Sequence, residues 1–158
     1  MSKSGAESRE KSAALMEICS VRLGNSLYGM PITHILEIVG AAHPQPVPLA
    51  PGFVGGLAHY RGEVLTTVSL RHLLGMPPYA GTQDILVLEC ASGCFGLLVD
   101  SVGEVLTVAR SSYESNPSTL DECRKTLFDG TYKLKDSLLV MLDPERLDPL
   151  KLGAVQPA

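Results

Sequence analysis

The sequence is poor in charged residues and has no surplus of basic ones. Lysine and arginine number 13 against 17 aspartates and glutamates, which gives a net charge of −4, and charged residues make up only 19% of the chain. Proteins that hold nucleic acid need a surplus of basic side chains to neutralise the phosphates. No such surplus is present here, so a nucleic-acid partner is not expected.

Long apolar runs are also missing. Residues 1–11 are polar and charged, and no apolar run follows them of the kind that a secretory signal needs. No later stretch reaches the roughly 20 apolar residues of a membrane-spanning helix. We therefore expect a cytoplasmic protein with no segment inserted in a membrane.

None of the common catalytic spacings is present. The four histidines are His34, His43, His59 and His72. They form no HExxH motif and no paired ligand spacing, so most of them are expected at the surface. The sequence has neither a glycine-rich phosphate loop nor a GxSxG elbow, and nothing pairs Asp84 or Asp100 with a base or nucleophile. We expect no enzymatic activity and no cofactor or metal.

Four cysteines are spread along the chain, at Cys19, Cys90, Cys94 and Cys123. Only Cys90 and Cys94 are close, on either side of a turn at Ser92-Gly93, and in a reducing cytosol they stay as thiols. Two interpretations remain open: buried or half-buried structural thiols, or a small thiol- or metal-dependent enzyme that uses Cys90 and Cys94.

Short apolar runs separated by turn residues are what the sequence does contain. With 158 residues, of which 45% are hydrophobic, the chain has enough apolar material for one compact unit or two small subdomains. A hairpin is predicted at 18–30 around the turn Gly24-Asn25-Ser26. Later strands are predicted at 54–60, 63–70, 84–90, 95–101, 103–109, 130–134 and 137–142.

Helices are predicted to be few and short. Pro31 suits the first turn of an amphipathic helix over 32–39, because its apolar residues follow helical spacing up to Gly40. Further helical segments are predicted at 71–74, 118–127 and 143–147. A proline-rich segment at 44–51 is interpreted as a stiff extended connector, with polyproline recognition as the alternative.

This pattern predicts a mainly β fold of two small barrels. Residues 1–15 are interpreted as a flexible tail, 16–148 as the folded domain and 149–158 as a frayed C-terminal tail. The glycine- and proline-containing stretch 75–82 is the clearest linker, so a boundary between the two subdomains is expected near 75–83. Residue identity between the halves is too weak to indicate a sequence repeat.

The order of three motifs resembles the CheW-like domain family. They are "ITHILEIVG", "VPLAPGFVGGLAHYRGEVLTTVSLRHLLG" and "FGLLVDSVGEVLTV", and the match runs from about Ile18 to Leu147. The resemblance implies two intertwined five-stranded SH3-like barrels with short helices. It also implies a chemotaxis adaptor that binds the regulatory domain of a CheA-type histidine kinase and the tip of a methyl-accepting chemoreceptor, in arrays on the inner face of the membrane.

Two charged residues stand out as binding candidates. Gly62 is expected to adopt a backbone conformation that a side chain would forbid, and Arg61 presents a planar fork of donors suited to a carboxylate. That carboxylate is either Glu37 of this chain or a group on a partner, and the two interpretations are compatible. Glu37 lies among apolar residues and must be solvated or paired. The resemblance ties Arg61 and the segment around Glu37 to receptor coupling.

Apolar candidates follow from the same resemblance. Receptor contact is expected at Ile35 and Ile38, as helix-in-groove anchors, and at Val99, Val105 and Val108, with core packing as the alternative for Ile35 and the three valines. Kinase contact is expected at Val47, Leu49, Val54, Gly55 and Gly56, where the alternative for the two glycines is that they only let a strand bend.

Two departures from the family pattern bear on partner choice. His59-Tyr60 replaces a common Asn-Leu pair before Arg61-Gly62, and Ser69 replaces a common aspartate before Leu70-Arg71. An adaptor for a chemosensory system that controls pili, surface behaviour or second-messenger output is therefore kept as an alternative.

Overall fold

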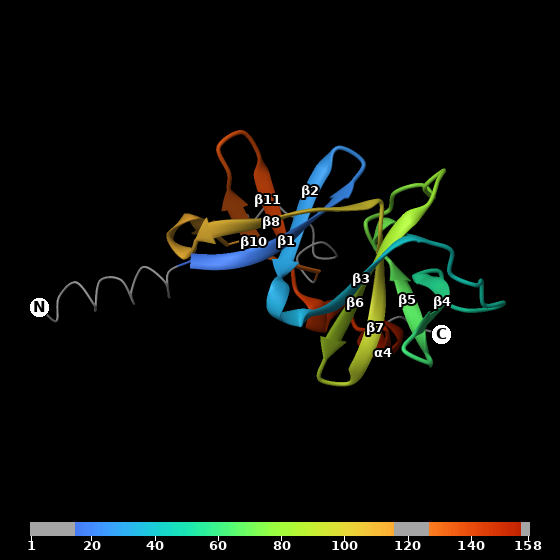
Figure 1. Cartoon of the computed structure of the whole chain (residues 1–158). Coiled ribbons are helices and arrows are strands. Elements are labelled where there is room, and N and C mark those ends of the chain that lie inside the picture. Colours follow the sequence, from blue (N-terminus) through green and yellow to red (C-terminus); the bar gives the residue numbers. More distant parts are fainter. Residues whose placement is uncertain (1–14, 116–126, 156–158) are drawn as a thin grey trace, which may run out of the picture.

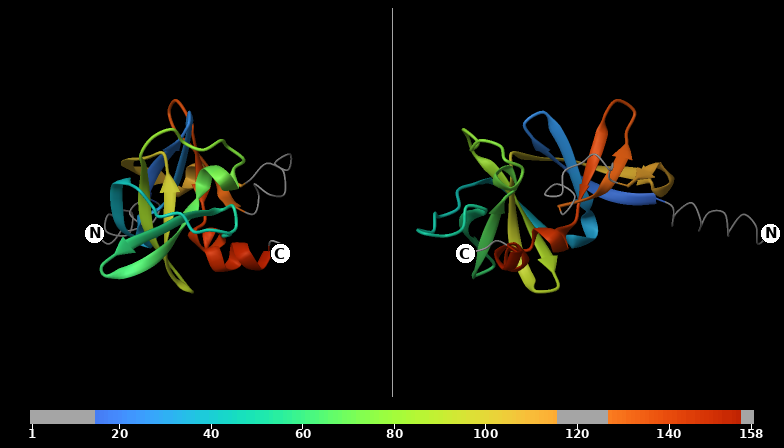
Figure 2. Two further views of the ribbon diagram at one scale, coloured as in Figure 1. Left: turned by 90° about the vertical axis from the view of Figure 1, so that its right-hand side faces the viewer. Right: turned by 180° about the vertical axis from the view of Figure 1, so that it is seen from behind.

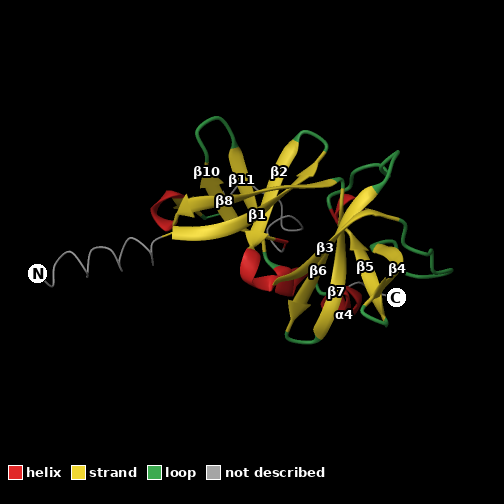
Figure 3. Ribbon diagram, viewed as in Figure 1, coloured by secondary structure: helices red, strands yellow, loops and turns green. Residues whose placement is uncertain are grey.

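The computed structural model describes residues 15–115 and 127–155, which form two curled β-sheets lying end to end (Figures 1 and 2). The first sheet has the strand order β8-β1-β2-β11-β10-β9, and the second has the order β3-β6-β7-β5-β4. We call them the first barrel and the second barrel. Strands dominate both, and the few helices are short (Figure 3), which confirms the predicted mainly β fold.

The first barrel takes its strands from both ends of the chain: β1 (Leu15–Leu23), β2 (Ser26–Pro31), β8 (Ser101–Ala109), β9 (Tyr113–Glu114), β10 (Phe128–Lys133) and β11 (Leu138–Leu142). The second barrel consists of β3 (Ile35–Ala42), β4 (Val54–Tyr60), β5 (Glu63–Ser69), β6 (Gln83–Cys90) and β7 (Gly93–Val99). The helical segments are η1 (Ile32–His34), α2 (Leu70–Leu73), η2 (Arg110–Ser112), η3 (Pro144–Leu147) and α4 (Pro149–Val155).

Each hairpin predicted from the sequence is present. The turns at Gly24-Asn25, Arg61-Gly62 and 91–92 join strands whose residues pair in antiparallel register, and β10 and β11 pair likewise. The helix predicted at 118–127 lies outside the described residues except at its last position.

Two segments differ from prediction. The helix expected over 32–39 is wrong: only Ile32–His34 make a single helical turn, and Ile35 begins strand β3, which pairs antiparallel with β6. The C-terminal tail expected from residue 149 instead forms the helix α4, which starts directly after Asp148. The amide N–H of Leu150 donates to Asp148 Oδ1 over 3.0 Å, and this bond secures the first turn.

The linker at 75–82 lies within the second barrel, between α2 and β6. The chain passes from one barrel to the other between β2 and β3 and again between β7 and β8. The barrels are therefore intertwined, and the expected boundary near 75–83 does not coincide with either crossing.

The two barrels repeat one topology. The order β3-β6-β7-β5-β4 matches β8-β1-β2-β11-β10, and in each barrel the third and fourth strands of this order pair in parallel while the others pair antiparallel. Thr67 lies opposite Gly96 in one barrel, as Met141 lies opposite Gly29 in the other. The first barrel is thus a permuted copy of the second, because its β1-β2 hairpin comes first in the chain rather than last.

The largest apolar cluster lies between the barrels. Buried residues from β1 and β2, such as Val21 and Met30, pack with residues of β6 and β7, such as Leu88 and Leu97. Each barrel also has a smaller core of its own. Burial of apolar surface across the junction makes the two barrels one packed unit.

An ion pair joins the barrels at this junction. Arg71 of α2 donates from Nε and Nη2 to the two carboxylate oxygens of Asp100, each over 2.6 Å, and the Gly24 amide donates to Asp100 Oδ2 over 2.8 Å. Burial alone would raise the pKa of Asp100, but the hydrogen bonds from Arg71 and Gly24 outweigh it and the pKa is lowered. Asp100 is therefore a charged clamp between the second-barrel helix α2 and the β1-β2 turn.

A second carboxylate joins the neighbouring strands β3 and β8. Asp84 accepts from the Ala41 amide over 3.2 Å and from the Val102 amide over 2.9 Å. These bonds hold the end of β3 beside the start of β8.

Candidate docking surfaces

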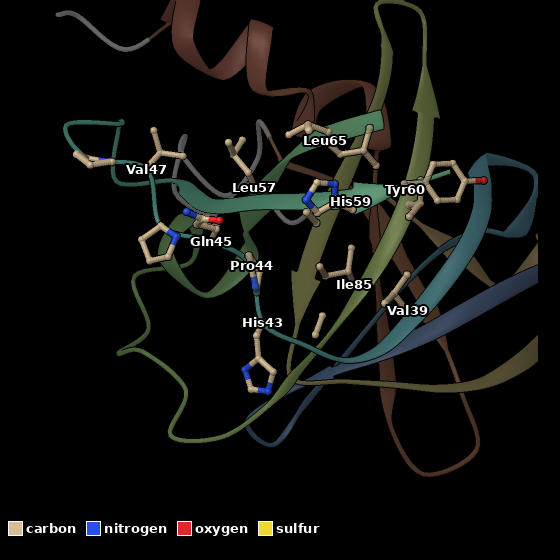
Figure 4. A pocket seen from close by; sticks show the side chains of 16 residues that line it. Val39, His43, Pro44, Gln45, Val47, Leu57, His59, Tyr60, Leu65 and Ile85 are labelled. Atoms are coloured by element: carbon tan, nitrogen blue, oxygen red, sulfur yellow. The ribbon is translucent and has the colours of Figure 1, made fainter. Parts of the chain in front are cut away.

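A groove of about 540 Å³ opens along the seam between β3 and β4 (Figure 4). Its floor is the second-barrel core, with the buried side chains of Leu65, Ile85 and Val87. Val39 of β3 and Tyr60 of β4 stand on opposite sides of it. The seam exists because β3 and β4 are the two edge strands of this sheet and do not pair with each other. An apolar floor under an open seam is suited to receiving an apolar side chain.

The connector, residues 43–53, closes part of this seam. Gln45 and Leu57 exchange two backbone hydrogen bonds of 2.8 Å each, so the connector runs along the outer edge of β4. Val47 lines the groove, and Leu49 projects fully into solvent with a φ of 64°. A left-handed backbone is unfavourable for leucine, and a fully exposed leucine gains nothing from folding. Leu49 therefore has the features of a binding residue.

The glycines of the predicted kinase surface serve the fold instead. Gly56 is buried with a φ of 126°, and a Cβ placed on it would lie 2.7 Å from the Gln45 carbonyl oxygen. A Cβ on Gly55 would lie 3.0 Å from Thr67 Oγ1, inside the barrel. These positions permit the bulge after Val54 and the close approach of the connector. The bending role, left open by the sequence, is the one their geometry supports, and Val54 is half-buried against the core.

Strand β3 presents exposed residues next to the groove. The register shifts between Ile35 and Glu37, which breaks the alternation and leaves Leu36, Glu37 and Ile38 all exposed. Ile35 is half-buried and packs on the central core. Because the segment is a strand, the expected helix-in-groove contact is wrong, and any partner meets a strand surface at Ile38.

Arg61 lies at the β4-β5 turn with a φ of 47°, followed by Gly62 with a φ of 79°. Nothing lies within 4 Å of a Cβ built on Gly62, so its backbone angle alone requires glycine, as predicted. The Arg61 guanidinium carbon lies 5.2 Å from the centre of the Tyr60 ring. Among the described residues no ion pair joins Arg61 to Glu37, so the internal pairing considered from the sequence is not formed.

The three valines of the predicted receptor surface differ in their exposure to solvent. Val99 and Val108 are buried, at 0% and 5% exposure, so they offer no surface to a partner and follow the core-packing alternative. Val105 on β8 is 58% exposed. The strand pairing makes it the first-barrel counterpart of Ile38, because Val105 lies opposite Cys19 as Ile38 lies opposite Leu86.

Comparison with known proteins bears on this two-barrel arrangement. The family model for the CheW-like domain matches residues 17–149, which is most of the chain. The chain belongs to the CheW-like family.

Characterised relatives of this CheW-like chain are of similar length. The chemotaxis protein CheW of Rhizobium meliloti is 27% identical over 135 residues, covering 84% of this chain and 87% of that protein. CheW of Treponema pallidum is 25% identical, covering 83% and 81%, and CheW of Helicobacter pylori is 27% identical, covering 91% and 88%. Chemotaxis signalling, as an adaptor, is thus the function of this chain.

The fold agrees with a solved structure. The crystal structure of the scaffolding protein TtCheW from Thermoanaerobacter tengcongensis superposes with a TM-score of 0.76 at 24% sequence identity, covering 85% of this chain and 92% of that one. The likeness confirms the CheW-like pair of SH3-like barrels.

The two departures from the CheW-like sequence pattern lie in different parts of the structure and have different roles. His59 and Tyr60 both line the groove between β3 and β4, where a partner side chain would meet them. Ser69 instead caps α2, because its Oγ accepts from the His72 amide over 3.2 Å. The first departure lies in the groove between β3 and β4, and the second affects the fold.

The neighbouring thiols Cys90 and Cys94 do not form a common site. Cys90 is buried and its thiol donates to the Gly93 carbonyl oxygen over 3.2 Å, whereas Cys94 is exposed. Cys94 pairs across the hairpin with Glu89 rather than with Cys90, so the two thiols face opposite sides of the sheet. Cys123 lies outside the described residues. Within residues 15–115 and 127–155 no group of three or more metal-ligating side chains occurs, and no helix is long and apolar enough to cross a membrane.

Several exposed apolar residues were not singled out from the sequence: Leu36, Leu57, Val64 and Leu138. Each belongs to a predicted apolar run, and only the strand register shows which members of the run face outward. For Val64 the sequence does contain a signal. Side chains alternate between the two faces of a strand, so Val64 faces outward if its neighbour Leu65 faces the core, as it does in the structure.

Proposed function

We propose that this chain couples a methyl-accepting chemoreceptor to the regulatory domain of a CheA-type histidine kinase, in receptor arrays on the inner face of the membrane. The observation that carries the proposal is that exposed apolar residues gather in two separate places on the second barrel and its junction with the first. One is the connector with its groove, and the other is the pair of strands β3 and β8. An adaptor needs two such surfaces on one rigid body, and it changes kinase activity only by binding the on and off arrangements with different affinity.

The kinase surface comprises Val47, Leu49 and the apolar groove behind them. Leu49 is the leading residue, because its side chain is fully exposed and is held out by the Val47–Ala50 turn, in which the Ala50 amide donates to the Val47 carbonyl oxygen over 3.3 Å. Apolar anchors at the centre of an interface contribute most of the binding energy. Gly55 and Gly56 act indirectly, by letting the connector lie against β4.

The receptor surface comprises Glu37 and Ile38 on β3, Val105 on β8, and Arg61. Asp84 holds β3 and β8 together, so apolar residues from both barrels are presented from one assembly of strands. Arg61 has no carboxylate partner among the described residues, and its donors are free to bind an acidic side chain of the receptor.

Two single variants test the division of surfaces. Leu49→Glu should lower affinity for the kinase regulatory domain at least tenfold, about 1.4 kcal/mol, and leave receptor binding unchanged. Ile38→Glu should do the reverse. Leu150→Glu, at an exposed position on α4 outside both surfaces, is the matched control. Isothermal titration with each purified partner measures both affinities.

Either of two results would contradict the proposal. One is failure of the unmodified chain to bind any kinase regulatory domain encoded in the same genome at micromolar concentration. The other is an equal effect of Leu49→Glu and Leu150→Glu on both partners, which would mean that the two surfaces are not distinct.

A further inference from the structure

Each barrel contains one pair of parallel strands that are hydrogen-bonded over a few residues only. The two strands of the pair separate from each other toward the hairpin turns that precede them. In the second barrel β5 and β7 pair only at Thr67–Ser69 with 96–98, and in the first barrel β2 and β11 pair only at Tyr28 and Gly29 with Val140 and Met141. Beyond these short pairings a groove opens between the strands in each case. We call these grooves the second-barrel seam and the first-barrel seam.

A helix of the chain itself lies over the second-barrel seam. Pro149, Leu150 and Gly153 of α4 form one wall of a groove of about 410 Å³, opposite Thr66 of β5 and Phe95 of β7. Phe95 is only 1% exposed, and it belongs to the central core cluster against which Leu152 of α4 also packs.

The helix is held there by the carboxylate that precedes it. Asp148 is buried, accepts a hydrogen bond from the Ser92 hydroxyl in the β6-β7 turn, and accepts another from the Leu150 amide. The second-barrel seam therefore recognises a short apolar helix that begins with a carboxylate.

The first-barrel seam has the same walls without a helix. Its groove, about 370 Å³, is lined by Leu27 and Tyr28 of β2 and by Leu138 and Val140 of β11. The registers make Tyr28 the counterpart of Phe95, yet Tyr28 is half-buried, and Leu138 is 58% exposed. The β1-β2 and β10-β11 hairpins diverge around this groove (Figure 2). No helix among the described residues lines it.

The polar rim of the first-barrel seam suits a carboxylate. Asn25 occupies the turn position that Ser92 occupies in the other barrel, since each precedes the residue that starts the second strand of its hairpin. Arg22 also lines the groove, is exposed, and forms no ion pair with any described residue. A cation at the rim and an amide at the turn complement the negative start of an apolar helix.

We propose that the first-barrel seam is a third docking surface, separate from the kinase and receptor surfaces. Its occupant is a short apolar helix of another protein, with an aspartate or glutamate at its start that meets Arg22 and Asn25. The helix takes the place over β2 and β11 that α4 takes over β5 and β7.

The test uses a peptide whose sequence is that of residues 147–155, acetylated and amidated, titrated into the full isotope-labelled chain and followed by NMR. Binding with a dissociation constant below about 1 mM is expected to shift the Tyr28 and Val140 amides. Their second-barrel counterparts, Phe95 and Thr66, should stay in place.

Variants locate the site. Leu138→Asp should weaken peptide binding at least tenfold, and Leu138→Ala is the milder second variant if the first disturbs folding. Arg22→Glu should weaken binding about threefold to tenfold, and a peptide with Asp148→Asn should lose a similar amount. Val64→Asp, at the counterpart of Leu138 in the second barrel, is the matched control and should leave binding unchanged.

Three results would overturn the proposal. Absence of shifts at 2 mM peptide, about twice the expected dissociation limit, would mean that the seam does not bind such a helix. Shifts confined to Phe95 and Thr66 would mean that the peptide only displaces α4. A concentration-dependent dimer of the chain alone that is lost in Leu138→Asp would assign the seam to a second copy rather than to another protein.

Discussion

Replacing Asp100 by asparagine tests whether the charged clamp holds the two barrels together. Asp100 is 8% exposed and Arg71 is 11% exposed, and the pair is bidentate with both N–O distances at 2.6 Å. The Gly24 amide also donates to this carboxylate. The substitution keeps the shape of the side chain, removes its charge and leaves one acceptor oxygen for three donor groups.

The expected loss follows from what Arg71 retains. Removing one partner of a buried ion pair costs about 3–5 kcal/mol, because the other charge stays buried without compensation. Arg71 keeps a 2.7 Å hydrogen bond to the Pro77 carbonyl oxygen and lies 4.9 Å from the Tyr79 ring centre. We therefore expect Asp100→Asn to lower the free energy of unfolding by about 2–3 kcal/mol, with a fall in Tm of roughly 5–10 °C.

Urea unfolding at pH 7, followed by circular dichroism, measures the loss. The control is Glu114→Gln, because Glu114 pairs with Lys133 on the surface with side chains 56% and 63% exposed. That variant should cost less than about 0.5 kcal/mol. If Asp100→Asn costs no more than Glu114→Gln, the clamp does not stabilise the junction and the reasoning from burial is wrong.

The same carboxylate makes stability depend on pH. The pKa of Asp100 is lower in the folded chain than its unfolded value of about 3.9. Its contribution is therefore complete above about pH 4 and is lost as the pH falls from there through the lowered folded pKa. The difference in unfolding free energy between the unmodified chain and Asp100→Asn should shrink over this acid range, and a difference that stays constant would contradict the assignment.

Three further predictions concern single positions. Leu49→Gly removes the cost of a left-handed backbone at leucine, about 1–2 kcal/mol, and adds about 0.5–1 kcal/mol of unfolded-state entropy that opposes folding. Thermal unfolding should therefore show unchanged or slightly higher stability, while affinity for the kinase falls. Destabilisation would contradict this. Gly56→Ala should cost about 2–4 kcal/mol in urea unfolding. It should cost more than Gly93→Ala, because Gly93 has a similar φ of 129° but nothing lies within 4 Å of a Cβ built on it; equal losses would remove the role given to the connector. Asp148→Ala should cost about 1–2 kcal/mol and raise amide exchange across α4, and unchanged exchange would mean that α4 is held by other contacts.

The hairpins were predictable because their signals are local. Gly24-Asn25 and Arg61-Gly62 adopt turns that their own residues favour, and alternation on either side marks the strands. Strand β3 was mistaken for a helix because Ile35, Leu36 and Val39 also satisfy helical spacing. The bulge near Glu37 hides the two-residue period, and pairing with β6, some fifty residues later in the chain, decides the outcome.

The docking surfaces were predictable only in part. Exposure of Leu49 and burial of Val99 are properties of the assembled barrels, and both residues belong to apolar segments in the sequence. The helix α4 had a local start signal in Asp148-Pro149, yet its place on the barrel also depends on the hydrogen bond that the Ser92 hydroxyl, in a distant turn, donates to Asp148. Burial of a given residue is thus set by contacts that no local pattern contains.

The duplication escaped sequence comparison because residue identity between counterpart strands is weak, although the strands follow the same order in both halves of the chain. Strands β1, β2, β3, β4 and β5 of the first half correspond to β6, β7, β8, β10 and β11 of the second half. When the barrels are aligned by strand pairing, Glu37-Ile38 falls on Glu104-Val105, and Gly56 falls on Gly130. The same exposed carboxylate and apolar residue therefore recur on the edge strand of each barrel, so a surface that binds with Ile38 has a second, related surface at Val105. Because Asp84 holds the two edge strands together, a ligand large enough to span them meets both at once, and loss of either residue should weaken it by less than loss of both.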